Sequence, residues 1–375
     1  MRAAGAAASR SSSRLSLRER LLASPQFQRW AAAFPLTRPL ARRRAGALFD
    51  LCAGFVYSQT LLATVRLGLC EALLEGAQSL ESLARRLTIP MEGAARLLRA
   101  TEALGLTVRR ADGRVALGSL GAALAGNPGI AAMVRHHAML YDDLRDPEAL
   151  LRGDRVDTSL ARLWPYAGHE RPAALLAEDV APYSDLMASS LPLVAAELLA
   201  VYRFGRHRCL LDLGGGDGAF LSAVAATAPD VRLLLFDLPA VADRARARFA
   251  REGLTDRALA YGGDIRSGPW PEGADIVSLI RVIHDHDDTA ALAILRGARH
   301  ALPPGGTLLV AEPMAGTPGA RTVGAYFEFY LLAMGSGRPR TAAELAALMR
   351  QAGFARVRAL ATHQPMLVRL LVAQR

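Results

Sequence analysis

The chain has 375 residues, 51% of them hydrophobic, so it can bury a large core and is long enough for two domains. Its net charge of +10 is concentrated at one end, because residues 1–45 contain ten arginines and a single acid, Glu19. About +1 is left for the other residues, which disfavours a uniformly basic nucleic-acid-binding protein. The three cysteines lack the spacing of a zinc or redox motif, and charges interrupt every apolar run, so we expect a soluble cytoplasmic protein.

Residues 1–45 form a basic arm that also contains large apolar side chains. Phe27, Trp30, Phe34 and Leu36 lie among its arginines, a mixture typical of a segment that rests on an anionic membrane surface. A solvated tail, or one packed against a partner, would have the same composition. Both interpretations remain open at this point.

Residues 46–126 have the pattern of a small helical domain with a hairpin. Apolar residues at three- and four-residue spacing predict a long amphipathic helix that packs against a partner surface. Two short helices follow, and alternation around Asp112-Gly113 predicts a hairpin. This order of elements is that of a winged helix. The expected helices cover residues 46–75, 79–87 and 91–104, and the hairpin covers residues 106–117.

The last of these helices would be the one to read DNA. It contains Arg96 and Arg99, but Glu92 and Glu102 accompany them. A recognition helix needs a basic surface, so this mixed charge favours a structural or dimerising role. We therefore predict a winged-helix-like domain with a structural or dimerising role and no nucleic-acid partner.

Residues 127–204 read as helices interrupted by prolines, which predicts a linker that forms the roof of a pocket. Breaks are expected at Pro147, Pro165, Pro172, Pro182 and Pro192. From residue 205 to residue 375, strand and helix patterns alternate, which predicts a doubly wound, Rossmann-like parallel sheet and places the chain in the α/β class. The expected parallel strands cover residues 209–213, 231–236, 258–261, 275–280 and 307–311, and residues 354–360 and 366–372 form an antiparallel edge pair.

The turn after the first of these strands, Asp212 to Gly218, joins an apolar strand to a new helix. Gly214 and Gly216 allow positive φ and close approach by a ligand, and the helix start offers free N–H groups. An ordinary glycine turn is the alternative. The glycines, with Ala219, also match the dinucleotide pattern G-x-G-x-x-A, and Asp237 lies where a ribose-binding acid is expected.

A second acid at a strand end helps to choose between these ligands. Asp237 ends the second strand, and Asp264 follows the third. One strand-end acid suits a ribose, and the other suits an adenine amino group. This pair favours an adenosyl cofactor other than a dinucleotide.

The segment Arg281 to Asp288 follows the fourth strand, and strand ends carry the sites in such folds. His284 is a candidate general base, because an imidazole titrates near neutrality. His284, His286 and the neighbouring acids are also potential metal ligands, and Asp287 or Asp288 is a potential N-cap of the next helix. We favour the general base and expect no metal.

Over residues 46–375 these motifs resemble the class I S-adenosylmethionine-dependent O-methyltransferases of the caffeate and acetylserotonin type. The resemblance implies a homodimer, an N-terminal winged-helix domain and a catalytic domain that binds S-adenosyl-L-methionine. In that family the glycine turn receives the methionine part of the cofactor, Asp237-Leu238 matches the ribose-binding pair, and Gly263-Asp264-Ile265 matches the adenine contacts. The implied cofactor-binding residues are Met187, Gly214, Gly216, Asp237, Leu238, Asp264, Ile265 and Arg281.

The resemblance also implies the catalytic residues. His284 falls on the histidine of the family motif H-D-W-x-D, and His286 stands where the tryptophan would be. Glu312 matches the acid that orients the base, and Glu344 corresponds to a second such acid. His284 would accept the hydroxyl proton, and Glu312 would fix its tautomer.

Residues 23–39 and 48–59 bear a closer resemblance to a subgroup from purple photosynthetic bacteria. That subgroup methylates the C-1 tertiary hydroxyl of acyclic carotenoids such as demethylspheroidene and hydroxyneurosporene. A substrate dissolved in lipid would explain the basic arm and place the protein at the periphery of the photosynthetic inner membrane. The alternatives are a phenolic, polyketide or bacteriochlorophyll-type substrate for the same catalytic domain, or a winged-helix regulator that senses a nucleotide-like ligand.

Overall fold

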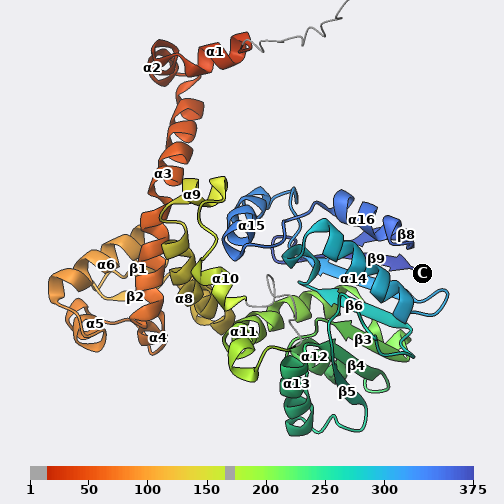
Figure 1. Cartoon of the computed structure of the whole chain (residues 1–375). Helices are drawn as coiled ribbons and strands as arrows, with labels where there is room; N and C mark the ends of the chain where they lie inside the picture. The colour runs from red at the N-terminus through yellow and green to blue at the C-terminus, as the bar shows by residue number, and fades with distance from the viewer. Residues whose placement is uncertain (1–14, 165–173) are drawn as a thin grey trace, which may run out of the picture.

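The computed structural model describes residues 15–164 and 174–375. Figure 1 shows a small helical part beside a larger α/β body, with the first helices projecting away from both. The large sheet is formed by the C-terminal part of the chain.

Three helices begin the described chain: α1 (Leu17–Ala23), α2 (Pro25–Ala33) and α3 (Arg38–Arg66). Helix α3 begins earlier than expected and ends before Gly68, whose φ of +71° starts the separate helix α4 (Leu69–Leu74). The expected helix over residues 46–75 is therefore two helices. The apolar side chains of its outer half, Leu48, Phe49, Leu51 and Phe55, are exposed in the single chain.

The predicted winged-helix pattern is confirmed. Helices α5 (Leu80–Arg86) and α6 (Met91–Ala103) precede the antiparallel strands β1 (Thr107–Arg109) and β2 (Val115–Leu117), and α7 (Ser119–Ala125) follows. On α6, Arg96 forms an ion pair with Glu92, and Glu102 pairs with Arg109 of β1. Both acids of α6, Glu92 and Glu102, are thus paired with arginines, so α6 does not present a uniformly basic surface to DNA.

A helical segment links this domain to the sheet: α8 (Pro128–Asp143), α9 (Pro147–Arg152), α10 (Ser159–Leu163) and α11 (Ala177–Val201). Pro147 begins α9, where a proline is well tolerated. Pro182 and Pro192, however, lie inside α11 and do not end it, because the packing of this helix against α8 and α12 outweighs the lost backbone hydrogen bonds. The expected breaks at Pro165 and Pro172 lie outside the described residues.

Helices α8 and α11 approach each other closely at Gly129. A Cβ atom at this position would lie 2.4 Å from the carbonyl oxygen of Ser189 on α11. Because Gly129 has no side chain, α8 packs directly against the backbone of α11, which we call the roof helix.

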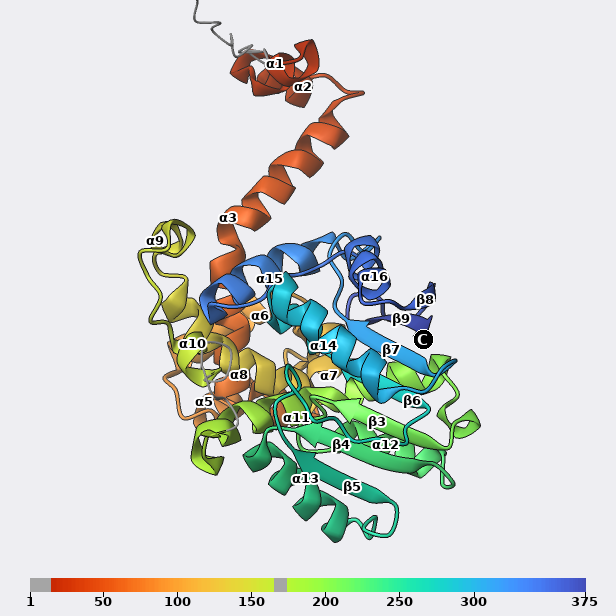
Figure 2. The same cartoon turned by 45° about the vertical axis from the view of Figure 1, so that its right-hand side comes forward.

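The sheet has seven strands in the order β5-β4-β3-β6-β7-β9-β8, which confirms the Rossmann-like fold and its antiparallel edge pair (Figure 2). Its parallel strands are β3 (Cys209–Leu213), β4 (Arg232–Asp237), β5 (Ala258–Gly262), β6 (Ile276–Ile280) and β7 (Thr307–Glu312). The edge pair is β8 (Ala355–Leu360) and β9 (Arg369–Gln374). The strand order reverses between β3 and β6, and ligands bind at the carboxyl edge of such a switch point.

Helices cover both faces of the sheet, so its central strands are buried on both sides and mostly apolar. One face packs against α11, α12 (Ala219–Thr227) and α13 (Pro239–Arg251). The other face packs against α14 (Asp288–Ala301) and α16 (Ala342–Gln351), while α15 (Arg321–Met334) lies nearer the linker helices.

Two helices in the described part of the chain are long and apolar enough to span a membrane by length and composition alone: α3 and residues Tyr183–Val201 of α11. Acidic residues interrupt both, Asp50 in α3 and Asp185 in α11. The apolar side of α11 includes Val194 and Leu198, which belong to the core of the sheet domain. Packing in the sheet domain therefore accounts for the apolar side of α11.

Candidate active site

A cavity lies at the carboxyl edge of β3, β4 and β6, below α11. Its wall contains all eight residues that the family resemblance implies for cofactor binding: Met187, Gly214, Gly216, Asp237, Leu238, Asp264, Ile265 and Arg281. These residues come from five separate segments of the chain. Four of the segments follow parallel strands whose carboxyl ends share one edge, and helix α11 contributes Met187.

The glycine turn forms the floor of this cavity. Gly214 and Gly216 have φ of +69° and +61°, so both need the left-handed conformation that glycine adopts without strain. A Cβ at Gly214 would lie 2.8 Å from Val282, whereas Gly216 borders open space. The N–H of Gly216 donates to Asp237 at 2.8 Å, which fixes the turn against the next strand end.

The two strand-end acids have different surroundings. Burial raises the pKa of Asp237 to about 6, although backbone N–H groups of Gly216 and Leu238 bind its carboxylate. Burial would also raise the pKa of Asp264, but hydrogen bonds from Arg266 outweigh it and hold that pKa below its usual range. Arg266 also lines the cavity, a contact that no motif in the sequence indicates.

Arg281 holds the roof helix over the cavity. Its φ of +55° turns the chain at the end of β6, and its guanidinium donates to Ser190 Oγ at 2.8 Å and to the Met187 carbonyl at 3.3 Å. Arg281, for which the family resemblance implies a cofactor contact, thus anchors α11. Ser190 was not expected, since nothing in the local sequence marks a contact with a residue 91 positions away.

His284 and Glu312 form a buried pair beside the cavity. The Nδ1 atom of His284 is hydrogen bonded to Glu312 Oε2, and Glu312 Oε1 accepts the N–H groups of Val282 at 3.0 Å and Ile283 at 2.7 Å. Because a carboxylate accepts, this bond places the proton on Nδ1 and directs Nε2 to the other side. We call residues 282–286 the base segment. Glu312 therefore fixes both the ring of His284 and the backbone of this segment.

A second carboxylate faces the other ring nitrogen. Asp285 Oδ1 lies 3.0 Å from His284 Nε2, and Asp285 lines the cavity. Burial alone would lower the pKa of His284, but the charges of Asp285 and Glu312 raise it to about 9. The ring of Phe327, on α15, closes a further side at 5.6 Å between centroids.

Comparison with known proteins shows what kind of enzyme has these parts. The family model for the O-methyltransferase domain matches residues 173–355, and the O-methyltransferase dimerisation domain matches residues 49–125. Demethylspheroidene O-methyltransferase of Cereibacter sphaeroides is 43% identical over 342 residues, 90% of this chain and 89% of that one. The chain belongs to the O-methyltransferase family. The Rhodobacter capsulatus protein of the same name is 39% identical over 350 residues, 91% of this chain and 85% of that one.

Solved structures of O-methyltransferases share the fold. The mitomycin 7-O-methyltransferase MmcR has a TM-score of 0.72 and 27% identity, over 90% of this chain and 99% of that chain. The pyocyanin biosynthetic protein PhzM has a TM-score of 0.73 and 25% identity, over 89% and 99%. The family and fold that the sequence motifs indicated are thus confirmed.

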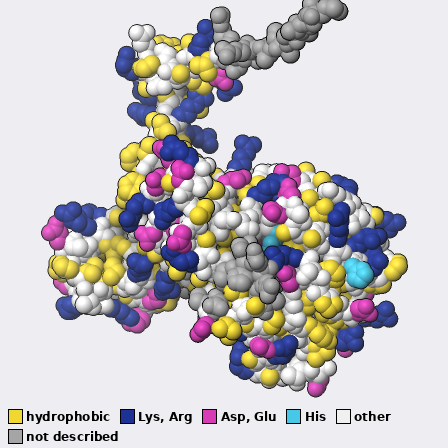
Figure 3. All heavy atoms as spheres, in the orientation of Figure 1, with side chains coloured by type: hydrophobic (Ala, Val, Ile, Leu, Met, Phe, Trp, Pro, Cys, Tyr) yellow, Lys and Arg dark blue, Asp and Glu magenta, His cyan; other side chains and the backbone are white. Residues whose placement is uncertain are grey.

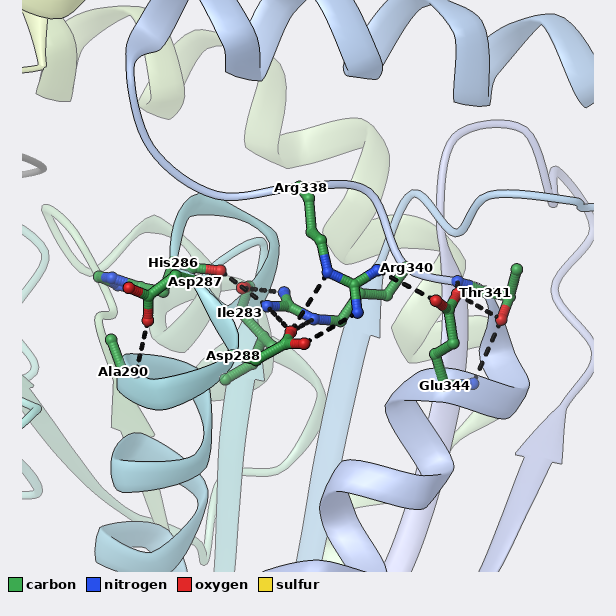
Figure 4. A network of polar contacts seen from close by, with 9 residues as sticks. All are labelled: Ile283, His286, Asp287, Asp288, Ala290, Arg338, Arg340, Thr341 and Glu344. Carbon is green, nitrogen blue, oxygen red and sulfur yellow. Dashed lines mark hydrogen bonds and ion pairs between the residues drawn. The ribbon is translucent and has the colours of Figure 1, made fainter. Parts of the chain in front are cut away.

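Within this O-methyltransferase, the segment after α15 holds the base segment in place (Figure 4). Four consecutive carbonyl oxygens, those of residues 283–286, accept hydrogen bonds from residues 336–340. Their donors are Arg340 Nη1 to Ile283 at 2.8 Å, the Arg338 N–H to His284 at 3.0 Å, Ser336 Oγ to Asp285 at 2.8 Å and Arg340 Nη2 to His286 at 2.8 Å. We call residues 336–340 the cradle.

The cradle requires a glycine at its centre. Gly337 has φ of +80°, and a Cβ atom there would lie 2.1 Å from the carbonyl oxygen of His284. The main chain of the cradle can therefore approach the base segment only because this position has no side chain.

The expectation that Glu344 is a second orienting acid is wrong. Glu344 accepts hydrogen bonds from the N–H and hydroxyl of Thr341 in a capping box at the start of α16, and it pairs with Arg338 (Figure 4). Asp288 likewise pairs with Arg338 and Arg340. The carboxylates that flank the base are instead Glu312 and Asp285.

Residues 281–288 also allowed an N-cap and a metal-ligand interpretation. Asp287 is the N-cap of α14, since its side chain accepts the N–H of Ala290 at 2.8 Å. His286 lines the cavity, and burial lowers its pKa to about 4, so it is a neutral ring there. Among residues 15–164 and 174–375, no three His, Cys, Asp or Glu side chains are placed to share a metal ion.

Proposed function

We propose that this O-methyltransferase transfers the methyl group of S-adenosyl-L-methionine to the C-1 tertiary hydroxyl of an acyclic carotenoid. The observation that supports the cofactor is the cavity that all eight expected residues line together, with open space at Gly216 and a carboxylate at Asp237. The support for the substrate is the likeness, over about nine-tenths of the chain, to two proteins named demethylspheroidene O-methyltransferase.

The residues beside the cavity are suited to this reaction. The cofactor supplies an electrophilic methyl group, so the protein has to hold a hydroxyl oxygen in line and remove its proton. His284 Nε2 accepts that proton, and Glu312 on Nδ1 stabilises the imidazolium that forms. A tertiary alcohol is a much weaker acid than a phenol, so a positioned base contributes more to its methylation.

Pigment analysis tests the substrate. Cells that lack the gene are expected to accumulate hydroxylated, unmethylated carotenoids, seen by mass spectrometry, and the purified protein should transfer label from S-adenosyl-L-methionine to a 1-hydroxy carotenoid. Phenolic and polyketide acceptors should accept label at least about a hundredfold more slowly, because positioning dominates the rate. An unchanged carotenoid profile, or transfer to a phenol alone, would contradict the proposal.

We infer that the chain works as a homodimer, with residues 46–126 as the dimerisation domain, 127–204 as linker and roof, and 205–375 as the catalytic domain. The matched dimerisation domain begins at residue 49, within the exposed apolar face of α3. Phe49, Leu51 and Phe55 on that face are 64 to 81% exposed in the single chain, and a second copy would cover them.

We further propose that the basic arm contacts an anionic membrane. Figure 3 shows apolar side chains next to arginines over α1, α2 and the outer part of α3. Trp30 stacks on Phe34 with ring centroids 5.2 Å apart, yet Trp30 is 53% exposed, and Leu36 and Leu40 are exposed nearby. Side chains of this kind, with arginines beside them, suit the headgroup region of a bilayer from which a lipid-dissolved substrate is taken.

Vesicle flotation tests this contact. We expect the full chain to float with vesicles that contain phosphatidylglycerol and to remain in solution with pure phosphatidylcholine. Replacing Trp30 and Phe34 by serine should weaken binding by at least about tenfold, because their apolar burial is lost. The matched control is Leu259→Ser, an exposed apolar residue on β5, which should leave flotation unchanged. Equal flotation of the arm variant and the native chain, with a changed oligomeric state, would instead identify the arm as an interface between copies.

A further inference from the structure

Both ring nitrogens of His284 face a carboxylate, and the two carboxylates differ in their other partners. Glu312 has two backbone N–H donors besides the ring. Asp285 Oδ1 is 3.0 Å from Nε2 but is not aligned as a hydrogen bond, and no other described residue donates to this buried atom. Its main compensating charge is therefore a protonated His284.

Arg281, the arginine whose charge also acts on Asp285, has no ion pair or hydrogen bond with it among the described contacts. The guanidinium of Arg281 is bound to Ser190 and Met187 on the roof helix. The carboxylate of Asp285 thus lies beside His284 Nε2, the atom that exchanges a proton with the substrate. It also borders the cavity, so it is placed where the hydroxyl has to arrive.

We propose that Asp285 is a positioning residue whose charge beside Nε2 makes His284 a stronger base, matched to a weakly acidic aliphatic alcohol rather than to a phenol. The proposal rests on the methyl-transfer function and refines its substrate class. In the reaction the O–H bond of the alcohol breaks, its proton goes to Nε2, and the oxygen forms the bond to the methyl group that leaves the sulfonium. The imidazolium so formed lies between two carboxylates, which lowers the energy of the transition state.

The other titratable groups around His284 either lower its pKa or carry no charge. Arg281 opposes the two carboxylates, and His286 is neutral. Burial raises the pKa of Tyr183 on α11 and of Tyr330 on α15 well above its usual value, so neither phenol adds charge. Removal of the Asp285 charge should consequently be felt directly by His284. The groups near the base or near Asp285 are Arg281, Glu312, His286, Tyr183, Tyr330 and the apolar Phe327.

The test is Asp285→Asn, which keeps the shape of the side chain. At saturating cofactor and carotenoid, the ascending limb of kcat against pH should move to lower pH by about one unit or more. Above that limb the variant should be at least several-fold slower, so that the two profiles cross. Asp285→Glu, which retains the charge, should keep the native midpoint. A variant that is slower at every pH with an unmoved midpoint would overturn the proposal.

A second readout needs no carotenoid. The His284 imidazole can be titrated by NMR in the enzyme bound to S-adenosylhomocysteine, and Asp285→Asn should lower its midpoint by the same amount. The matched control is Asp287→Asn, which removes an acid two residues away that only caps α14. An unmoved His284 midpoint in Asp285→Asn overturns the inference, whereas a moved midpoint with no methylation of carotenoids would overturn the proposed substrate alone.

Discussion

His284→Ala is expected to lower turnover by about 10²- to 10⁴-fold, the range for loss of a positioned general base. Binding of S-adenosylhomocysteine should change by less than about twofold, because His284 is not among the residues that line the cavity. Initial rates with labelled cofactor measure the first effect, and calorimetric titration with S-adenosylhomocysteine measures the second. Unchanged turnover would reject the assignment of His284 as the base.

Glu312→Gln provides the companion measurement. The amide oxygen can still accept the N–H groups of Val282 and Ile283, so the segment should remain folded. The ring loses its charged partner on Nδ1, and turnover should fall by about tenfold or more with little change in cofactor affinity. Equal activity of this variant and the native enzyme would show that the pair serves only the fold.

Arg340→Met should both destabilise the protein and lower its turnover. Arg340 is 3% exposed, and it donates to the carbonyls of Ile283 and His286 and to Asp288. Its removal leaves the buried carbonyl oxygen of Ile283 and the partly buried one of His286 without these donors, at about 1–3 kcal/mol each. We expect a loss of about 3–5 kcal/mol in the free energy of unfolding and at least about a tenfold loss of turnover in the folded fraction.

A neighbouring arginine is the matched control for this effect. Arg338 shares Asp288 with Arg340, but its side chain is 41% exposed, and only its backbone N–H contacts the base segment. Arg338→Met should therefore cost about 1 kcal/mol or less. Thermal or urea unfolding distinguishes the two variants. Equal destabilisation by both would show that the cradle acts through its surface charges and not through the carbonyls of the base segment.

The sequence is sufficient where the signal is local. The glycine turn, Asp237 and Asp264 are each recognised within a few residues, and the alternation of strands and helices brings them to one edge. The hairpin around Asp112-Gly113 follows from its turn residues in the same way. The grouping of the glycine turn with Asp237 and Asp264 is thus predictable from local motifs, whereas Met187, Leu238, Ile265 and Arg281 were expected only from the family resemblance.

The parts that the sequence does not predict depend on distant contacts. The bonds from the cradle to residues 283–286 join segments about fifty positions apart, and nothing in either segment marks the other. Pro192 inside α11 obeys tertiary packing rather than local preference. At Glu344 the local signal and the family resemblance disagree: Thr341-x-x-Glu344 is a capping-box sequence, and the structure follows that local signal.

The close approach of α8 to α11 at Gly129 has a consequence for the assembled enzyme. Helix α11 carries Met187 at the cofactor cavity, and α8 packs against α3, the helix on which the matched dimerisation domain begins. Ligand binding and subunit association therefore both involve the packed helices α3, α8 and α11. By thermodynamic reciprocity, any factor by which filling the cavity strengthens association is also the factor by which association strengthens cofactor affinity.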